Sequence, residues 1–352
     1  MALLEVQDLH TRFRTDDGVV KAVSGVSFSL DRGQTLGIVG ESGSGKSVTF
    51  LTVMGLVDPR HAEMTGSVRF DGQEILGLRA SQLHNIRGQR MGMIFQDPMT
   101  SLNPVKKIGW QLEEAVLIHN DVPRAEARRR AIEVLKEVEI PRAETRIDDY
   151  AHQFSGGMRQ RVMIAMALIN QPEVLIADEP TTALDVTTQA QILRLMEKLQ
   201  DEHGMAIVMI THDLGVVAEL ADDVIVMYGG RVVEEAKVDD LFEKPEMPYT
   251  WGLLGSLPRV DINAERLEQI PGQPPSLLRP PPGCAFNPRC AYAFDRCREE
   301  LPELRPAEGK EEHHFRCHLD AGDRTRIWAQ KKAALTAAVA KSALDAQAEK
   351  AV

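Results

Sequence analysis

The chain has 352 residues, with 41 Lys and Arg against 52 Asp and Glu, so its formal net charge is -11. This length can hold a full α/β core and a smaller second domain. The acidic balance repels a polyanion and argues against nucleic acid as a partner. No apolar run approaches the ~18 to 20 residues of a transmembrane helix, and the first ten residues lack a basic region followed by a long apolar core. We expect a cytoplasmic chain that acts at the membrane only through partners.

The first part of the chain, residues 3–37, is predicted to be rich in β-structure. Residues 4–6 and 26–30 alternate apolar and polar side chains on either side of the turn Asp16-Asp17-Gly18. This pattern indicates a small antiparallel sheet.

A glycine-rich stretch, Gly40-Glu41-Ser42-Gly43-Ser44-Gly45-Lys46-Ser47, follows the apolar run 35–39 and precedes a helical pattern. Small residues at this spacing fold the backbone into a nest of N–H donors at a helix N-terminus, which favours phosphate. We expect Lys46 to reach the β- and γ-phosphates of a nucleotide and Ser47 to bind Mg²⁺. The candidate nucleotide-binding residues here are Gly40, Ser42, Gly43, Ser44, Gly45, Lys46, Ser47 and Val48.

Further along, short apolar runs alternate with helical patterns. Residues 66–72 and 91–95 are predicted strands, the second ending at Gln96, and residues 105–138 are predicted to be a helical insertion. The runs 174–177, 206–210 and 224–227 are typical of parallel strands covered on both faces, with helices at 158–169 and 187–199. This alternation predicts a doubly wound α/β sheet.

Two carboxylates, Asp178 and Glu179, end the apolar strand at 174–177. Ligands bind at the carboxyl ends of strands in open α/β sheets. We expect Asp178 to hold Mg²⁺ through water and Glu179 to act as the general base that polarises the attacking water.

The run Phe154-Ser155-Gly156-Gly157-Met158 resembles the signature motif of ATP-binding-cassette (ABC) ATPases, which more often reads Leu-Ser-Gly-Gly-Gln. Other family motifs follow in order. Gln96 matches the Q-loop glutamine, Asp185 the D-loop aspartate and His212 the switch histidine, while Phe13 stands where the family usually has a Tyr that stacks on adenine. The resemblance implies roles for Gln96 in contacting water and Mg²⁺, for Glu179 and His212 in catalysis, and for Ser155, Gly156, Gly157 and Asp185 at the nucleotide.

The family geometry implies a dimer, because the signature turn of one cassette covers the ATP held by the other. The chain is also similar to the D-type ATPase subunit of dipeptide, oligopeptide and nickel importers, on the segments at 95–104 and 283–290. That resemblance implies a heterodimer with a homologous F-type ATPase, beneath two transmembrane permeases and indirectly served by a solute-binding protein. Met99, Leu102 and Asn103 are expected where a permease would dock.

All four cysteines, Cys284, Cys290, Cys297 and Cys317, follow a proline-rich stretch. Their spacing does not match the tight pairs of a zinc ribbon, but four thiolates can hold an iron–sulfur cluster. The resemblance to D-type subunits implies a [4Fe–4S] cluster. A zinc site that uses His313, His314 or His318 and a set of free thiols are the alternatives.

The predicted fold is therefore an ABC-type P-loop NTPase, a doubly wound sheet with an antiparallel β subdomain and a helical subdomain, plus a small cysteine-containing C-terminal domain. We assign residues 1–104 to the β-rich and core subdomain, 105–170 to the helical subdomain, 171–245 to the rest of the core, 246–320 to the C-terminal region and 321–352 to a mobile tail. The expected function is an ATPase that powers peptide import from the cytoplasmic face of the membrane. An importer of nickel or another small solute, a soluble ABC ATPase acting on DNA or ribosomes, and a non-hydrolytic regulatory subunit are the alternatives.

Overall fold

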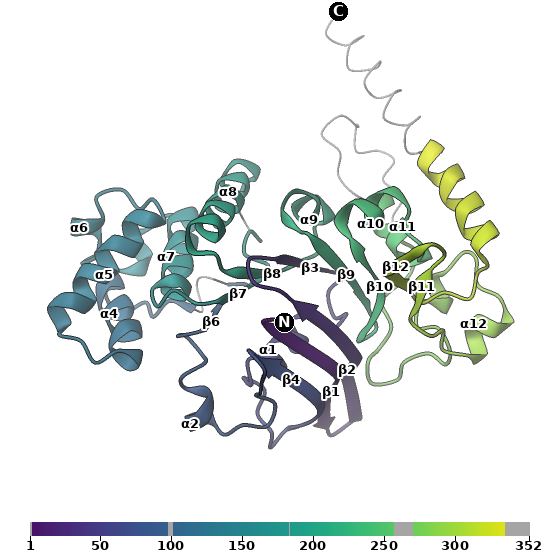
Figure 1. The fold of residues 1–352 in the computed structure, drawn as a ribbon, viewed down its shortest axis with the longest axis horizontal. Helices are drawn as coiled ribbons and strands as arrows, with labels where there is room; N and C mark the ends of the chain where they lie inside the picture. The colour runs from purple at the N-terminus through teal and green to yellow at the C-terminus, as the bar shows by residue number, and fades with distance from the viewer. Residues whose placement is uncertain (1, 98–100, 183, 257–269, 335–352) are drawn as a thin grey trace, which may run out of the picture.

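The computed structural model describes residues 2–97, 101–182, 184–256 and 270–334. Its centre is a mixed sheet of eight strands in the order β11-β12-β10-β9-β3-β8-β7-β6 (Figure 1). The five strands from β9 to β6 run parallel. Their bounds are β3 Thr35–Val39, β6 Met91–Ile94, β7 Val174–Asp178, β8 Ala206–Thr211 and β9 Asp223–Tyr228. Every residue of β3, β7 and β8 is buried, as the continuous apolar runs predict.

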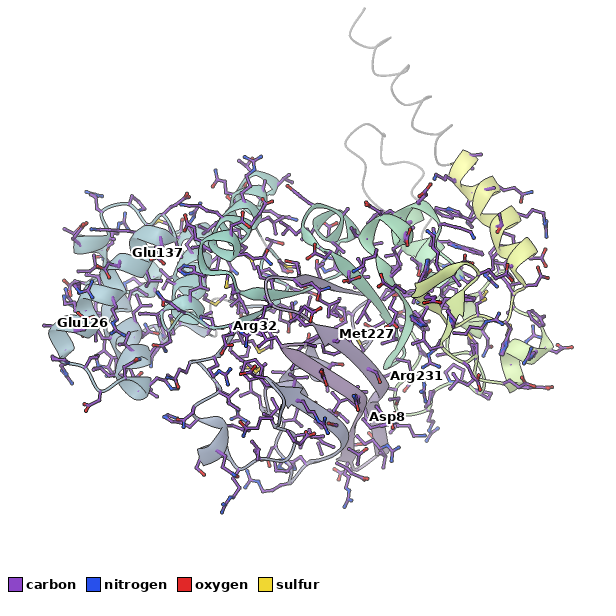
Figure 2. The ribbon with its side chains drawn as sticks, in the orientation of Figure 1. Asp8, Arg32, Glu126, Glu137, Met227 and Arg231 are labelled. Atoms are coloured by element: carbon purple, nitrogen blue, oxygen red, sulfur yellow. The ribbon has the colours of Figure 1, made fainter. Side chains whose placement is uncertain are left out.

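A second, antiparallel sheet has the order β2-β1-β4-β5 and contains the predicted N-terminal strands. Its strands are β1 Leu4–Thr15, β2 Gly18–Leu30, β4 Ala62–Phe70 and β5 Gln73–Glu74. Helix α1 (Lys46–Val53) packs on this sheet: the rings of Phe28 and Phe50 lie 5.4 Å apart, and the hydroxyls of Thr11 and Thr52 are hydrogen-bonded. Arg32, labelled in Figure 2, pairs with both Asp71 and Glu173 and so joins the two sheets.

The helical subdomain lies at one end of the molecule (Figure 1). The predicted helical segment at 105–138 is two helices, and Pro123 is the N-cap of the second. The helices of this part, preceded by the short α2 (Ala80–Leu83), are α4 Ile108–His119, α5 Arg124–Glu137, α6 Ala143–Arg146, the 3-10 turn Ala151–Gln153 and α7 Gly156–Leu168. They share a buried core with α8 (Val186–His203), which crosses back to the central sheet.

The C-terminal region joins the central sheet directly. Strand β10 (Arg231–Lys237) pairs with β9 on one side and with β12 (Lys310–Phe315) on the other, and β11 (Arg305–Ala307) forms the edge. The core sheet therefore continues beyond residue 245, where the sequence analysis ends it. Helix α9 (Leu214–Leu220) connects β8 to β9. The helices between β10 and β11 are α10 Val238–Glu243, α11 Pro248–Gly255, the 3-10 turn Asn287–Arg289 and α12 Asp295–Glu299.

Residues 321–334 are helical and packed, so the expectation of a mobile tail is wrong for this segment. Ile327 and Trp328 are buried, and Arg324, 3% exposed, pairs with the buried Glu246. The Trp328 indole donates a hydrogen bond to the carbonyl of Glu243. Residues 335–352 lie outside the described part. Among the described residues, no helix combines the length and apolar character required to cross a bilayer.

Candidate functional site

The glycine-rich stretch forms a loop between β3 and α1, as predicted. Gly40 and Gly45 adopt positive φ angles, 151° and 102°. A Cβ on Gly40 would lie 2.3 Å from the carbonyl oxygen of Met227, and one on Gly45 would lie 2.4 Å from that of Ala22. Only glycine fits at these two positions. Gly43 also has positive φ, but nothing lies within 4 Å of its would-be Cβ, so this part of the loop faces open space.

Polar groups of the loop are arranged to receive an anion. Lys46 is 5% exposed, and its Nζ donates to the carbonyl oxygens of Gly40, at 2.6 Å, and Glu41, at 3.1 Å. Burial lowers the pKa of Lys46, although the nearby carboxylates of Glu179, Asp178 and Glu41 act in the opposite direction. The buried Oγ of Ser44 has no hydrogen-bond partner among the described residues. A phosphate would satisfy this hydroxyl and the lysine together. Ser42 is exposed on the loop, and Val48 is half-buried in α1.

Ser47 and Asp178, each predicted separately to hold Mg²⁺, meet at the loop. The Ser47 hydroxyl donates to Oδ1 of Asp178 at 3.0 Å. Burial raises the pKa of Asp178, and the hydrogen bond from Ser47 opposes this shift. Two hard oxygen ligands beside a phosphate-binding loop suit Mg²⁺, which is held by few protein oxygens together with substrate phosphates.

Glu179 lies at the centre of a polar cluster. Its Oε2 accepts hydrogen bonds from Gln96 Nε2 and from the Thr182 hydroxyl, both at 2.9 Å, and its Oε1 lies 3.4 Å from Nδ1 of His212. The φ of Glu179 is +48°, a conformation uncommon for a non-glycine residue and concentrated at functional sites. The side chain of His212 is 60% exposed. Gln96 thus contacts the candidate base directly, and its contact with Mg²⁺ stays a prediction. The sequence does not predict the role of Thr182, because this threonine belongs to none of the recognised motifs.

Phe13 is half-buried on β1, the strand whose Thr11 contacts α1. It faces the core cluster that contains α1, so its phenyl ring is anchored near the loop helix. Its stacking on adenine stays a prediction.

The signature turn begins α7 in the helical subdomain. Ser155 caps this helix by accepting from the backbone N–H of Met158 at 3.4 Å. Ser155 and Gly156 are exposed, and a Cβ on Gly156 would meet nothing closer than Leu184, at 4.0 Å. No hydrogen bond or ion pair among the described residues joins this turn to the loop at 40–47. The glycines of this turn are therefore accessible from solvent at the start of α7.

Asp185 lies next to the signature turn. It caps α8 by accepting from the N–H of Thr188 at 3.0 Å and from its hydroxyl at 2.7 Å, and these bonds lower the pKa of Asp185. A Cβ on Gly157 would lie 2.7 Å from Cγ2 of the same Thr188, so the two turns adjoin. Val186 beside them is 84% exposed. Ala183 of the predicted D-loop lies outside the described residues.

Two of the three residues expected at a permease contact are described, and they differ in exposure to solvent. Leu102 is 2% exposed and belongs to the helical core, so it is not available for docking. Asn103 is exposed, and its side chain accepts from the backbone N–H of Val105. Met99 lies outside the described residues. Leu102 was misassigned because a leucine in a loop segment gives no sign of which face is buried.

An apolar groove of about 250 Å³ opens beside this segment, between α1, β6 and α7. Leu56 and Phe95 in it are 43% and 42% exposed. Its lining includes Met54, Leu56, Met91, Met93, Phe95, Met163 and Met166. Phe95 directly precedes Gln96, so the groove adjoins the Glu179 cluster along the chain.

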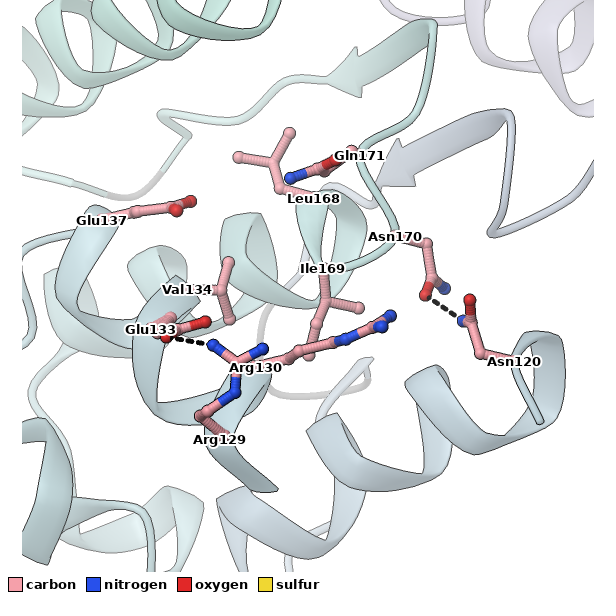
Figure 3. Close-up of a pocket in the computed structure, with 10 residues that line it drawn as sticks. All are labelled: Asn120, Arg129, Arg130, Glu133, Val134, Glu137, Leu168, Ile169, Asn170 and Gln171. Carbon is pink, nitrogen blue, oxygen red and sulfur yellow. Dashed lines mark hydrogen bonds and ion pairs between the residues drawn. The ribbon is translucent and has the colours of Figure 1, made fainter. Parts of the chain in front are cut away.

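A separate cavity of about 390 Å³ lies in the helical subdomain (Figure 3). Its walls are mainly charged and amide side chains, among them the hydrogen-bonded Asn120 and Asn170, which lie 3.0 Å apart. None of the predicted site residues lines it.

The C-terminal region contacts the glycine-rich loop at 40–47, and the sequence does not predict this contact. Two of the guanidinium nitrogens of Arg289, Nη1 and Nη2, donate to the carboxylate of Glu41, with Nη2 to Oε1 at 3.0 Å. The hydroxyl of Tyr249 accepts from the backbone N–H of Glu41 at 2.8 Å. Arg289 and Glu41 are 248 positions apart, and no local pattern connects them.

The four cysteines are free thiols that lie near one another. Burial raises the pKa of Cys284, of Cys290 to about 11 and of Cys317 to about 12, and the charges of neighbouring cysteines add to each shift. In the described part of the chain, no group of three or more His, Cys, Asp or Glu is arranged to hold a metal ion. His313 pairs instead with the buried Glu234 at 2.8 Å, and His318 Nε2 bonds the carbonyl of Glu300.

Comparison with known proteins agrees with this geometry. Residues 23–182 match the family model "ABC transporter", and residues 233–297 match "Oligopeptide/dipeptide transporter, C-terminal region". The chain is 52% identical to the oligopeptide transport ATP-binding protein OppD of Haemophilus influenzae, over 84% of this chain and 91% of that protein. It is 54% identical to the dipeptide transport ATP-binding protein DppD of Lactococcus lactis subsp. cremoris, over 85% and 86%.

The fold also resembles a solved structure, the dimeric structure of the bacterial ABC transporter cassette MJ0796. The TM-score is 0.60 and the identity 31%, over 67% of this chain and 98% of the other. These similarities extend across both the ATPase core and the C-terminal region. The chain therefore belongs to the ATP-binding proteins of the ABC transporter family, in the group that carries the oligopeptide/dipeptide transporter C-terminal region.

Proposed function

We propose that this chain is the ATP-hydrolysing subunit of an ABC importer of di- and oligopeptides. The observation that carries the proposal is the cluster at Glu179, which brings a Q-loop glutamine and a switch histidine onto one carboxylate beside the phosphate loop. The names of the relatives, oligopeptide and dipeptide transport ATP-binding proteins, favour peptide as the solute. A nickel importer is the alternative that the sequence resemblance leaves open.

ATP and Mg²⁺ fit the residues at the loop. Lys46 and the backbone around Gly43 would hold the phosphates, and Ser47 and Asp178 would hold Mg²⁺, which supplies charge neutralisation when bound. Glu179 is placed to accept a proton from the attacking water. Gln96 and Thr182 fix its Oε2, which leaves Oε1 facing His212.

The chain is proposed to work as a dimer, because its signature turn is exposed and, among the described residues, has no hydrogen bond or ion pair with its own loop. Ser155, Gly156 and Asp185 would complete the site of a second cassette. We propose that this second cassette is a homologous F-type ATPase, on the resemblance to D-type subunits. The dimer would sit at the cytoplasmic face of the membrane beneath two permeases.

The permease contact is proposed at the apolar groove rather than at Leu102. Leu56 and Phe95 are large apolar side chains left more than two-fifths exposed, as interaction sites require. Gln96 directly follows Phe95 and is hydrogen-bonded to Glu179. A permease segment that moves Phe95 in the groove would therefore also move Gln96 and, through its hydrogen bond, the catalytic carboxylate.

The four cysteines are proposed to hold a [4Fe–4S] cluster. Four thiols grouped in one segment match the Cys₄ donor set of such clusters. Among the residues that the structure describes, no group of three or more His, Cys, Asp or Glu is arranged to hold one metal ion. In a cluster each thiolate binds a different iron, so the sulfur atoms stand farther apart than around one zinc. We assign the cluster no part in hydrolysis.

The test is peptide uptake into vesicles that contain the complete transporter, with ATP inside. Uptake of a radiolabelled dipeptide or oligopeptide that requires ATP and is lost in Lys46→Ala supports the proposal. Transport of Ni²⁺ with no peptide uptake would replace peptide by nickel. Purification of the chain with ribosomes or DNA and without permeases would overturn the transport function.

A further inference from the structure

Arg289 is held in place entirely by the C-terminal half of the chain, apart from one carboxylate. Its side chain is 4% exposed. Its Nε donates to the carbonyl of Pro271 at 2.8 Å, its Nη2 to that of Ile270 at 3.2 Å, and its Nη1 to the Tyr228 hydroxyl at 3.3 Å. These bonds orient the guanidinium fork so that its remaining donors point at Glu41, which it binds through two nitrogens.

Glu41 in turn is built into the phosphate loop by its backbone. Its carbonyl oxygen accepts from Lys46 Nζ at 3.1 Å and from the N–H of Ser44 at 3.2 Å. Its own N–H donates to Tyr249 at 2.8 Å. A shift of Glu41 would therefore move the lysine and the serine that face the nucleotide.

The charge of Glu41 has a second effect. A carboxylate in a loop built for phosphates repels them, and its side chain is 28% exposed, so water screens it only in part. The Arg289 guanidinium neutralises this charge at bidentate geometry, and its pKa is raised by Glu41 and by Tyr228, so it stays protonated.

We infer that Arg289 is a positioning residue of the nucleotide site: through Glu41 it fixes the phosphate loop and cancels the carboxylate's repulsion of ATP, so the C-terminal region takes part in ATP binding within the same chain. The inference rests on the proposal that ATP binds the loop at 40–47. It adds to that site a residue supplied from 248 positions away, directly beside Cys290.

The test is binding of the fluorescent analogue mant-ATP, with Mg²⁺, to the full chain and its variants. Arg289→Ala is expected to raise the dissociation constant about tenfold, within the range of coupled neighbours. Arg289→Lys keeps the charge and loses the two-pronged guanidinium. Its dissociation constant is expected to lie between those of the unaltered chain and Arg289→Ala. In a Glu41→Gln background, Arg289→Ala should change the constant by about twofold or less, because no carboxylate is left unpaired. The matched control is Arg298→Ala, an exposed arginine of the same region that pairs with Asp295.

The outcomes separate the two proposals. If Lys46→Ala binds mant-ATP as well as the unaltered chain, the nucleotide site itself is wrongly assigned. If Lys46→Ala loses binding while Arg289→Ala binds normally, the role of Arg289 is refuted. An equal loss from Arg289→Ala with and without Glu41→Gln also refutes it, because that result means general disruption of the C-terminal region rather than an unpaired charge. Thermal unfolding of each variant identifies such disruption.

Discussion

Gln96 and Glu179 are 83 positions apart in the chain, and their side chains meet, with Nε2 of the amide donating to Oε2 of the carboxylate at 2.9 Å. The amide follows β6 and the carboxylate follows β7, which are neighbours in the parallel sheet. The segment that leads from the apolar groove therefore ends on the candidate base.

Glu179→Gln should abolish turnover and keep nucleotide binding, because an amide cannot accept the proton of the attacking water. The expected loss of ATPase activity in the assembled transporter is at least about a hundredfold, the usual contribution of a general base. Glu197→Gln, an exposed glutamate on α8, is the matched control. Normal hydrolysis by Glu179→Gln would show that the base lies elsewhere.

Asp178→Asn should stabilise the nucleotide-free chain while it removes Mg²⁺-dependent binding. Since burial raises the pKa of Asp178 in the folded state, its ionised form costs stability at a pH above that pKa, and the cost is lost as the pH falls through the raised pKa toward the ordinary value of the carboxyl. Asparagine keeps an acceptor for Ser47, so we expect a gain of about 1 kcal/mol. Thermal unfolding in a series of buffers from pH 7.5 downward should show the gain shrinking as the pH falls. A variant less stable than the unaltered chain at pH 7.5 would contradict the assignment.

Gly156→Ala should leave the chain stable and impair the assembled dimer. The glycine is the first residue of α7 and has free space around it, and alanine is the better helix former. A methyl group there would intrude only on a nucleotide brought by a second cassette. We expect unchanged thermal unfolding and ATPase activity at least about tenfold lower, which corresponds to 1.4 kcal/mol in the barrier. Full activity would argue against the turn as a nucleotide contact.

Phe95→Ser should weaken permease binding without changing nucleotide binding. The phenyl ring is 42% exposed in the apolar groove, and a buried aromatic anchor of an interface is worth about 2 kcal/mol or more. The affinity of the variant for the permeases should fall by about thirtyfold, measured by co-purification in detergent. Val19→Ser, at an exposed valine of β2 outside the groove, is the control, and equal losses from both would remove the groove from the interface.

Chain purified without oxygen should be brown, with absorbance near 400 nm and iron and sulfide in equal amounts, about four of each. Cys317→Ser should lose the colour, since this buried thiol faces the other three. Ser256→Ala, at a hydroxyl bonded within α11, is a control outside the cysteine segment. Colourless chain that contains zinc would replace the cluster by a zinc site.

The sequence predicts the phosphate loop, the acidic strand end and the signature turn well because each depends on neighbouring residues. Gly40 to Ser47 and Val174 to Glu179 are continuous stretches, and their spacing encodes their conformation. The parallel order of the core strands follows from their alternation with helices. The contact between Gln96 and Glu179 is not among the predictions, because the family resemblance implies for Gln96 only a contact with water and Mg²⁺.

What the sequence does not predict depends on contacts between distant segments. Strand β12, Lys310–Phe315, is largely polar and gives no strand pattern, and it becomes part of the core only by pairing with β10. Leu102 is buried by helices that follow it in the chain. Nothing in the residues around Arg289 distinguishes it from other arginines, and only the fold shows that it binds Glu41.

The pairing of β10 with β12 also affects synthesis of the chain. When residues up to Lys237 have left the ribosome, β10 has its partner β9 on one side only, and its other edge waits for residues 310–315. An unpaired edge strand recruits other strands, which makes a half-made chain prone to aggregation. The same holds for a fragment cut at residue 245: it would carry every ATPase motif and still lack the strand that closes its sheet.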